Sequence, residues 1–336
     1  MKSILYIGNK LSEYGLTVTS IDTLGLLLEN EGYKMQYAST KKNKISRMLD
    51  MFYKTISKFR HIDYVLIDTY STSNFWYTFF ISQLCRILKL KYIPILHGGN
   101  LPNRLNNNPF LCKMIFKNAY KNIAPSNYLF KAFNDKNYAE IIYIPNTIEL
   151  QNYHFKIRKI IEPKLLWVRS FTAIYNPEMA IKVLLELKSE FPNAELCMIG
   201  PDKDGTLPKI KQLANNLKLK VNFTGKLSKK DWTKLSEDYD IFINTTHYDN
   251  TPVSVLEALA MGIPVVSTNV GGIPFLLENR KNAILINDDD VSGMVSAIKE
   301  IINNSQLKDH LINNGLNLIQ EFDWERVKNK WVEILQ

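Results

Sequence analysis

The sequence lacks a cysteine framework, an uninterrupted apolar run long enough to cross a bilayer, and a cluster of metal-binding side chains. Its three cysteines are odd in number and widely spaced, so they predict buried or free thiols in a reducing cytoplasm rather than disulfides. The N-terminal run Ile4–Ile7 stops at Gly8 and is too short for the core of a signal peptide. The apolar stretch Phe75–Leu84 is well short of the roughly 20 residues that cross a bilayer. These absences predict a soluble, cytoplasmic protein.

Metal-binding and nucleic-acid-binding patterns are also missing. The five histidines are scattered, and no Asp-x-Asp motif follows a predicted strand. We therefore expect no metal and no other cofactor. No aromatic-rich strand or recognition motif supports a nucleic-acid partner.

Charge is unevenly divided along the 336 residues, whose net charge is +9. Residues 1–148 hold 19 Lys and Arg against 9 Asp and Glu, whereas the remainder holds 23 against 24. A basic first half predicts an anionic partner for that half alone. Anionic lipid and a phosphorylated acceptor are the candidates that remain once nucleic acid is set aside.

The segment Lys41–His61 has the pattern of a basic amphipathic helix. Apolar residues recur at three- and four-residue spacing among lysines and arginines: Ile45, Met48, Leu49, Phe52, Ile56 and Phe59. Two interpretations stay open. Either the stripe packs on a sheet, as in an ordinary helix, or it rests on anionic lipid as a peripheral contact with the inner face of the cytoplasmic membrane.

Short runs rich in Ile, Val, Leu and Tyr alternate with segments of helical length, which predicts parallel sheets with right-handed crossovers. The first series of predicted strands is Ile4–Ile7, Lys34–Ala38, Tyr64–Ile67, Tyr92–Leu96, Asn122–Pro125 and Ile141–Ile144. The second is Leu165–Val168, Glu195–Ile199, Val221–Thr224, Ile241–Asn244, Val265–Ser267 and Ala283–Ile286. We predict an α/β fold of two doubly wound, Rossmann-like domains, 1–148 and 149–322, facing a central cleft. A final helix in 323–336 would return to the first domain.

One charge stands in the long apolar stretch Asn250–Leu277, and it is Glu257. An ionised carboxylate is costly to bury without hydrogen-bond donors, so we expect either a buried cation or the vicinal hydroxyls of a sugar beside it.

Thr251 suits a helix cap and Pro252 the first helical position. Glu257 would then lie about 7.5 Å along the helix axis. The N–H groups at the start of that helix would suit a diphosphate. Asp249 precedes the helix, as a ligand contact or as a cap or turn residue.

The string DNTPVSVLEALAMGIPVVSTNVGGIP resembles the signature of retaining glycosyltransferases of family four, among the glycosyl transferases group 1, which have the GT-B fold. The resemblance implies that Asp249 contacts hydroxyls of the donor sugar and Glu257 those of the ribose. It also implies donor contacts from Asn250 and from the backbone at Thr251, Pro252 and Val253. The first acid is Asp here, where Glu is commoner in the family.

Further segments extend the resemblance to the rest of the chain. Trp167-Val168-Arg169 is similar to the family's strand that ends in an arginine, which implies that Arg169 balances the leaving diphosphate. A structural pair with Glu178 is the alternative. Asn176-Pro177 stands where the family has a Lys-Gly pair, so Lys226 or Lys203 is the candidate second cation. Gly200 joins the expected donor-binding residues.

In the first half, Leu96-His97-Gly98-Gly99 follows a predicted strand, and the family's histidine at this place contacts the donor sugar. A purely structural role for His97 stays open. The string GNKLSEYG, ending at Gly15, resembles the first loop of the fold, where glycine leaves room for a backbone to approach the donor.

These features predict a retaining, metal-independent hexosyltransferase. It would move a sugar from a UDP- or GDP-sugar to a glycan or lipid-linked acceptor, in the synthesis of bacterial cell-surface polysaccharide, lipopolysaccharide or glycolipid. A nucleotide-sugar 2-epimerase of the same fold is one alternative. A catalytically silent nucleotide-sugar-binding protein is another, and the missing Lys-Gly pair favours it.

Overall fold

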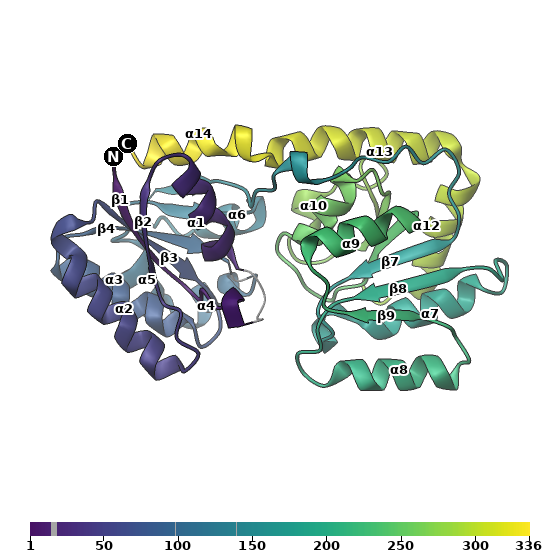
Figure 1. Ribbon diagram of the computed structural model, residues 1–336, viewed down its shortest axis with the longest axis horizontal. Helices are drawn as coiled ribbons and strands as arrows, with labels where there is room; N and C mark the ends of the chain where they lie inside the picture. Colours follow the sequence, from purple (N-terminus) through teal and green to yellow (C-terminus); the bar gives the residue numbers. More distant parts are fainter. Residues whose placement is uncertain (15–18, 98, 139) are drawn as a thin grey trace. The chain divides into compact units, whose positions relative to one another are not determined.

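The computed structural model describes residues 1–14, 19–97, 99–138 and 140–336, which form two compact units (Figure 1). Unit 1 consists of Met1–Pro145 together with Asn329–Gln336, and unit 2 consists of Asn146–Lys328. The division therefore falls after Pro145 rather than after Ile148, and the last helix, α14 (Trp324–Ile334), begins in unit 2 and ends in unit 1.

Unit 1 is built on one parallel sheet with the strand order β2-β1-β3-β4-β5-β6. The strands are β1 (Ser3–Ile7), β2 (Lys34–Ala38), β3 (Tyr64–Thr69), β4 (Lys91–Leu96), β5 (Asn122–Ala124) and β6 (Ile141–Tyr143). The helices are α1 (Ser20–Asn30), α2 (Lys44–Lys58), α3 (Phe75–Ile87), α4 (Leu101–Asn107), α5 (Pro109–Phe116) and α6 (Asn127–Asn134). All six predicted strands of this series are confirmed.

Unit 2 repeats the plan with the order β12-β11-β10-β7-β8-β9, again with parallel pairing. Its strands are β7 (Lys164–Val168), β8 (Glu195–Ile199), β9 (Asn222–Gly225), β10 (Ile241–Asn244), β11 (Val265–Thr268) and β12 (Ile284–Ile286). Its helices are α7 (Pro177–Leu187), α8 (Thr206–Asn216), α9 (Lys229–Leu235), α10 (Val253–Ala260), α11 (Ile273–Leu276), α12 (Val291–Asn303) and α13 (Ser305–Ile319). The second predicted series is confirmed as well.

Helices cover both faces of each sheet, so central strands such as β3 and β10 are buried along their whole length, whereas the edge strands β2 and β9 are partly exposed. Neighbours along β7 separate to opposite faces, as the two-residue period of a strand requires. Leu165 and Trp167 pack in the cluster that contains Leu184 of α7, whereas Leu166 packs with Leu256 of α10. Each unit thus has a two-layered core around its own sheet.

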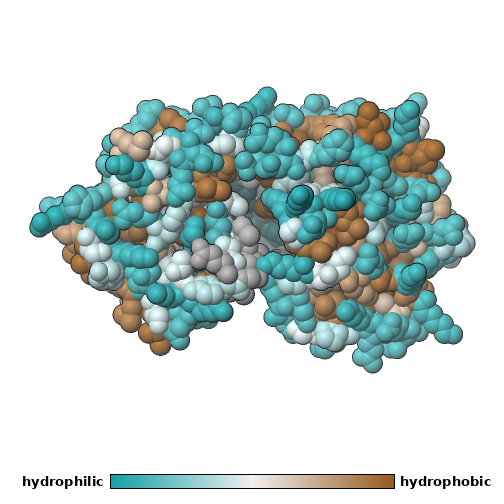
Figure 2. All heavy atoms as spheres, in the orientation of Figure 1, coloured by the Kyte–Doolittle hydropathy of each residue, from teal (hydrophilic) through white to brown (hydrophobic). Residues whose placement is uncertain are grey.

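Helix α2 is amphipathic, but its apolar residues divide between core and surface. Met48 and Phe52 pack against the core of unit 1, whereas Ile45, Leu49 and Ile56 are exposed. The prediction that the whole stripe packs on the sheet is therefore wrong for these three residues. Hydrophobic residues also reach the surface along this edge of unit 1 (Figure 2).

The end of the chain belongs to unit 1. The Tyr64 hydroxyl donates a hydrogen bond of 2.8 Å to the backbone oxygen of Gln336, and the Lys330 ammonium donates one of 3.4 Å to that of Tyr143. The prediction that the last helix returns to the first domain is confirmed by this placement.

The three cysteines are buried free thiols, as predicted. Burial raises the pKa of Cys85 to about 12 and that of Cys197 to about 11, which makes both thiols unreactive near neutral pH. Within the described part of the chain, no helix is long and apolar enough to span a bilayer.

Candidate functional site

The strand order of unit 2 reverses between β7 and β10, which are hydrogen-bonded neighbours at the centre of the sheet. Ligands of open α/β sheets bind at this kind of reversal, outside the carboxyl ends of the strands. Arg169 directly follows β7, and Asn244 is the last residue of β10. The topology thus brings together two segments that are 75 residues apart in the sequence.

Arg169 forms an ion pair with Asp249 at this edge. Its Nη2 lies 2.7 Å from Asp249 Oδ2, and its Nε donates a hydrogen bond of 3.4 Å to Asn244 Oδ1. The guanidinium also lies over the Tyr175 ring at 5.1 Å. The alternative pairing with Glu178 is wrong, because Glu178 pairs with Lys182 on the outside of α7.

Two glycines hold the Asp249 segment in place. The Gly272 N–H donates a hydrogen bond of 2.8 Å to the Asp249 carbonyl. A Cβ at Gly272 would lie 2.1 Å from the Asn250 carbonyl oxygen, and one at Gly271, whose φ is +55°, would lie 2.3 Å from that of Asp249. Only glycine permits this approach, which accounts for the Gly-Gly pair of the motif.

Helix α10 starts beside the ion pair without a side-chain cap. Pro252 occupies the N-cap position and Val253 is the first helical residue, one position later than predicted, so Thr251 does not cap the helix. The Ser254 hydroxyl is buried and has no hydrogen-bond partner among the described residues. Unsatisfied N–H groups, the helix dipole and a free hydroxyl together make this end of α10 suitable for an anion.

Glu257 lies on the buried part of α10, where two donors meet its Oε1. The Tyr153 hydroxyl donates a hydrogen bond of 2.7 Å, and the Lys229 ammonium lies 2.9 Å away. Burial first, and the Glu257 charge second, raise the pKa of Tyr153 well above its usual range. Of the two alternatives for Glu257, the structure shows a cation beside it, but Lys229 is exposed rather than buried.

Sequence reasoning missed both partners of Glu257. Tyr153 lies in a connecting segment without regular structure, and Lys229 is one lysine among several at the start of α9. Neither residue stands at a recognisable spacing from Glu257. Only the packing of unit 2 brings them together.

Gly200 and the two candidate lysines lie at the ends of β8 and β9. The φ of Gly200 is +152°, and a Cβ there would lie 1.7 Å from the Arg169 carbonyl oxygen. Its N–H donates to the Gly225 carbonyl at 2.9 Å. Burial and the neighbouring Lys226 charge lower the pKa of Lys203, so the two ammonium groups repel each other. An anion would relieve that repulsion.

Asn176, which stands in place of the family's lysine, has a structural role. It adopts a left-handed conformation with φ of +44°, and its side chain accepts a hydrogen bond of 3.2 Å from the Met179 N–H at the start of α7. Its amide group donates to Asp289 Oδ1 at 3.0 Å. It therefore caps a helix rather than supplying a cation.

In unit 1 the strand order reverses between β1 and β3, and His97 lies near this point at the end of β4. Its Nε2 lies 2.8 Å from Oδ1 of the buried Asp68, which also accepts a hydrogen bond of 2.9 Å from the Tyr6 hydroxyl. Sequence reasoning missed Asp68 and Tyr6, because both lie within continuous apolar strands. The predicted Gly15 lies outside the described residues.

No group of three His, Cys, Asp or Glu side chains that could hold a metal occurs in residues 1–14, 19–97, 99–138 and 140–336. The Arg169–Asp249 ion pair lies at the start of the loop that leads into α10.

Solved structures share this architecture over the full chain. Sucrose-phosphate synthase from Thermosynechococcus elongatus aligns with 99% of this chain and 98% of its own, with a TM-score of 0.81 at 16% identity. HepE of Anabaena in complex with UDP-glucose aligns with 100% of this chain and 99% of its own, with a TM-score of 0.80 at 16% identity. The fold is therefore GT-B, as predicted.

The sequence profile of the glycosyl transferases group 1 matches residues 151–318, half of the chain, and the chain belongs to this family. An uncharacterized glycosyltransferase of Haemophilus influenzae is 25% identical over 57% of this chain and 53% of its own length. The chain thus spans about half the length of that curated relative.

Proposed function

We propose that the protein is a retaining glycosyltransferase that transfers a sugar from a nucleoside diphosphate sugar to an acceptor hydroxyl. The observation that carries the proposal is the uncapped start of α10 between the Arg169–Asp249 ion pair and the buried Glu257. The family supports glycosyl transfer, and the UDP-glucose in the HepE structure supports this class of donor.

Each part of the donor has a matching group in unit 2. The diphosphate would meet the N–H groups at the start of α10, the Ser254 hydroxyl and Arg169. The ribose hydroxyls would bind Glu257, and the hydroxyls of the transferred sugar would bind Asp249. Lys203 and Lys226 would supply the second cation that Asn176 does not.

In the proposed reaction, the bond between the sugar C1 and the diphosphate oxygen breaks as the acceptor oxygen bonds to C1 on the same face. The acceptor proton passes to the oxygen of the leaving diphosphate, so no nucleophilic side chain is required. The role of the protein is electrostatic: Arg169 and the start of α10 stabilise the negative charge that develops on the leaving group.

Donor binding is tested by a thermal-shift screen of UDP-, GDP- and ADP-sugars. A donor at about 100 times its Kd stabilises a protein by about 2.7 kcal/mol, which for a unit of this size raises the Tm by roughly 5–10 °C. Glu257→Ala should weaken the effective donor about 10- to 100-fold, because a charged hydrogen bond is lost. Glu278→Ala, at an exposed residue paired with Lys281, is the matched control. A screen in which no nucleotide sugar shifts the Tm contradicts the proposal.

The two alternative functions are separated from transfer by a second experiment. Mass spectrometry and NMR of the donor incubated without acceptor would reveal an epimerase, because only an epimerase then changes the sugar. A silent binding protein would bind the donor but would lose no cellular function in the Asp249→Ala variant. We expect Asp249→Ala to abolish transfer while the protein still binds nucleotide.

We propose that transfer needs no metal, since Arg169, Lys203 and Lys226 supply cationic groups for the diphosphate. Full activity in excess EDTA is the expected result. Loss of activity that added Mg²⁺ or Mn²⁺ restores would overturn this part.

The acceptor is proposed to be a glycan or a lipid-linked glycan of the bacterial cell surface, reached by peripheral contact with the cytoplasmic membrane. Exposed apolar residues on the basic helix α2 support that contact: Ile45, Leu49, Tyr53 and Ile56. Apolar residues on a basic helix fit an anionic lipid surface. Flotation with anionic vesicles should fall strongly in Leu49→Ser, whereas Leu185→Ser on α7 should have no effect. If vesicle binding depends neither on salt concentration nor on anionic lipid, the proposed contact of α2 with the membrane is excluded.

A further inference from the structure

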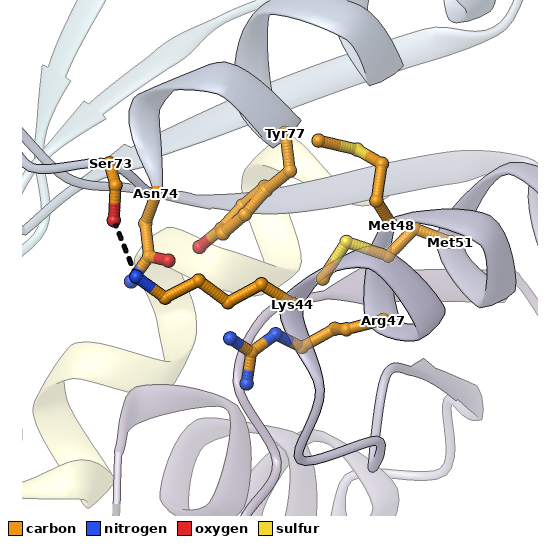
Figure 3. A pocket seen from close by; sticks show the side chains of 7 residues that line it. All are labelled: Lys44, Arg47, Met48, Met51, Ser73, Asn74 and Tyr77. Atoms are coloured by element: carbon orange, nitrogen blue, oxygen red, sulfur yellow. Dashed lines mark hydrogen bonds between the residues drawn. The ribbon is translucent and has the colours of Figure 1, made fainter.

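A pocket of unit 1 lies between the start of α2 and the start of α3, and none of its lining residues is among those assigned to the donor (Figure 3). Its volume is about 50 Å³. A single water needs only about 10–15 Å³, so the pocket has room for a small polyatomic group. The lining residues are Lys44, Arg47, Met48, Met51, Ser73, Asn74 and Tyr77.

The most unusual group of the pocket is Arg47. The residue is only 7% exposed, and its guanidinium forms no ion pair or hydrogen bond with any described part of the chain. Burial lowers the pKa of Arg47 below its ordinary value. A cation that is partly withdrawn from water without an acid to pair with loses hydration, and an anion that enters the pocket would offset that loss.

The other polar groups are arranged around the same space. The Lys44 ammonium donates a hydrogen bond of 3.3 Å to Ser73 Oγ, and both cationic side chains extend from α2 toward the start of α3 (Figure 3). Asn74 occupies the N-cap position of α3, but its side chain does not cap the helix. The lining contains no carboxylate among the residues that the structure describes. Two cationic side chains, two neutral polar side chains and no carboxylate make the pocket suitable for a doubly charged anion.

We propose that this pocket binds the phosphoryl group of a phosphate monoester. Arg47 and Lys44 would donate charge-assisted hydrogen bonds to its oxygens, and Ser73 and Asn74 would donate neutral ones. Ile45 and Leu49 are exposed on the same helix, so the surface beside the pocket suits a phosphate carried by a lipid. This binding needs no nucleotide sugar, so it stands or falls independently of the transfer reaction.

The test measures binding of glycerol 3-phosphate by calorimetry, and of phosphatidylcholine vesicles with or without phosphatidic acid by flotation. Arg47→Gln should weaken binding about tenfold or more, as expected for one charged hydrogen bond. Lys58→Gln removes an exposed charge from the other end of α2 and should change binding less than twofold at physiological salt. Lys44→Gln, at an exposed residue, gives an independent reading if Arg47→Gln destabilises unit 1.

The two binding arms distinguish the source of the phosphate. Arg47-dependent binding of glycerol 3-phosphate shows a pocket for a soluble ester. Arg47-dependent binding of phosphatidic acid vesicles alone shows a pocket for a lipid headgroup. Either result supports the proposal. If neither ligand binds, or if Arg47→Gln and Lys44→Gln bind as well as Lys58→Gln, the pocket does not hold a phosphoryl group.

Discussion

The edges at which the strands end differ between the two units. In unit 2, Asp249 and Glu257 each pair with a cation, Arg169 and Lys229. In unit 1, the buried Asp68 bonds to a hydroxyl and an imidazole, while Arg47 forms no ion pair within the described residues. When a ligand binds, its hydroxyls and phosphates can replace the partner of each paired charge in unit 2. No charge is then left in the interior without a partner. A cation without an ion-pair partner, such as Arg47, would instead be stabilised by an anion that binds from the solvent. The excess of positive charge in residues 1–148 agrees with this difference.

The largest expected effect is on kcat, and it distinguishes the Arg169–Asp249 ion pair from an ion pair on the surface. Arg169→Ala should lower kcat by about 10²–10³-fold, since one donor to the developing charge is lost. Arg280→Ala, which breaks the exposed pair with Glu300, should leave kcat unchanged. Steady-state kinetics with the effective donor check both values. Less than a threefold loss for Arg169→Ala would show that Arg169 does not act on the leaving group.

The second effect concerns the close packing of Gly200 against Arg169 at the carboxyl ends of the strands of unit 2. Gly200→Ala should destabilise the protein by about 3 kcal/mol, because the new Cβ would overlap the Arg169 carbonyl oxygen. Gly205→Ala is the matched control. That residue also has a positive φ, of +81°, but no atom lies within 4 Å of the added Cβ, so the cost should be about 1 kcal/mol. Urea unfolding measures the difference, and equal losses would mean that the contact at Gly200 is unimportant.

The corresponding test in unit 1 addresses Asp68, whose carboxylate bonds to the Tyr6 hydroxyl and the His97 imidazole. Tyr6→Phe should cost about 2 kcal/mol of unfolding free energy, because it removes a donor from the buried Asp68. Tyr92→Phe removes a hydroxyl that donates to the neutral Ile115 carbonyl at 2.6 Å, and should cost about 1 kcal/mol. If the order is reversed, Asp68 does not depend on Tyr6 for its stabilisation.

The last effect, small for a single tyrosine near pH 10, is a loss of folding stability at alkaline pH. Burial raises the pKa of Tyr6, Tyr77 and Tyr153 in the folded state. Above the unfolded value of about 10, the unfolded chain loses these protons and the folded chain keeps them. Unfolding free energy should therefore fall with rising pH, by up to about 1.4 kcal/mol per pH unit for each such tyrosine. Urea unfolding between pH 9 and 11 checks the slope, which Tyr77→Phe should reduce. A flat profile would contradict the assignment.

The sequence predicts each of the twelve strands that the described residues form, because most of them are short apolar runs bounded by turn residues. The residues assigned to the donor are also predictable in unit 2. Asp249, Glu257 and the glycine pair lie in one continuous segment, since β10, α10 and β11 follow each other at the switch point.

The rest depends on packing between segments that are distant in the sequence. Tyr153 reaches Glu257 across 104 positions, and Tyr6 reaches Asp68 across 62. No periodic pattern encodes such contacts. The apolar residues of α2 are a second case in which the sequence pattern alone does not determine the contacts. Their spacing predicts an amphipathic helix, but the packing of α3 decides which of them are covered.

The return of residues 329–336 to unit 1 has a consequence for the order of events during synthesis. On the ribosome, the first 145 residues emerge first, and all of unit 2 emerges before the segment that completes unit 1. At typical rates of translation the delay is roughly 10–40 s. Unit 1 therefore lacks its last segment until the whole of unit 2 has been synthesised. The basic unit 1 completes its structure only afterwards.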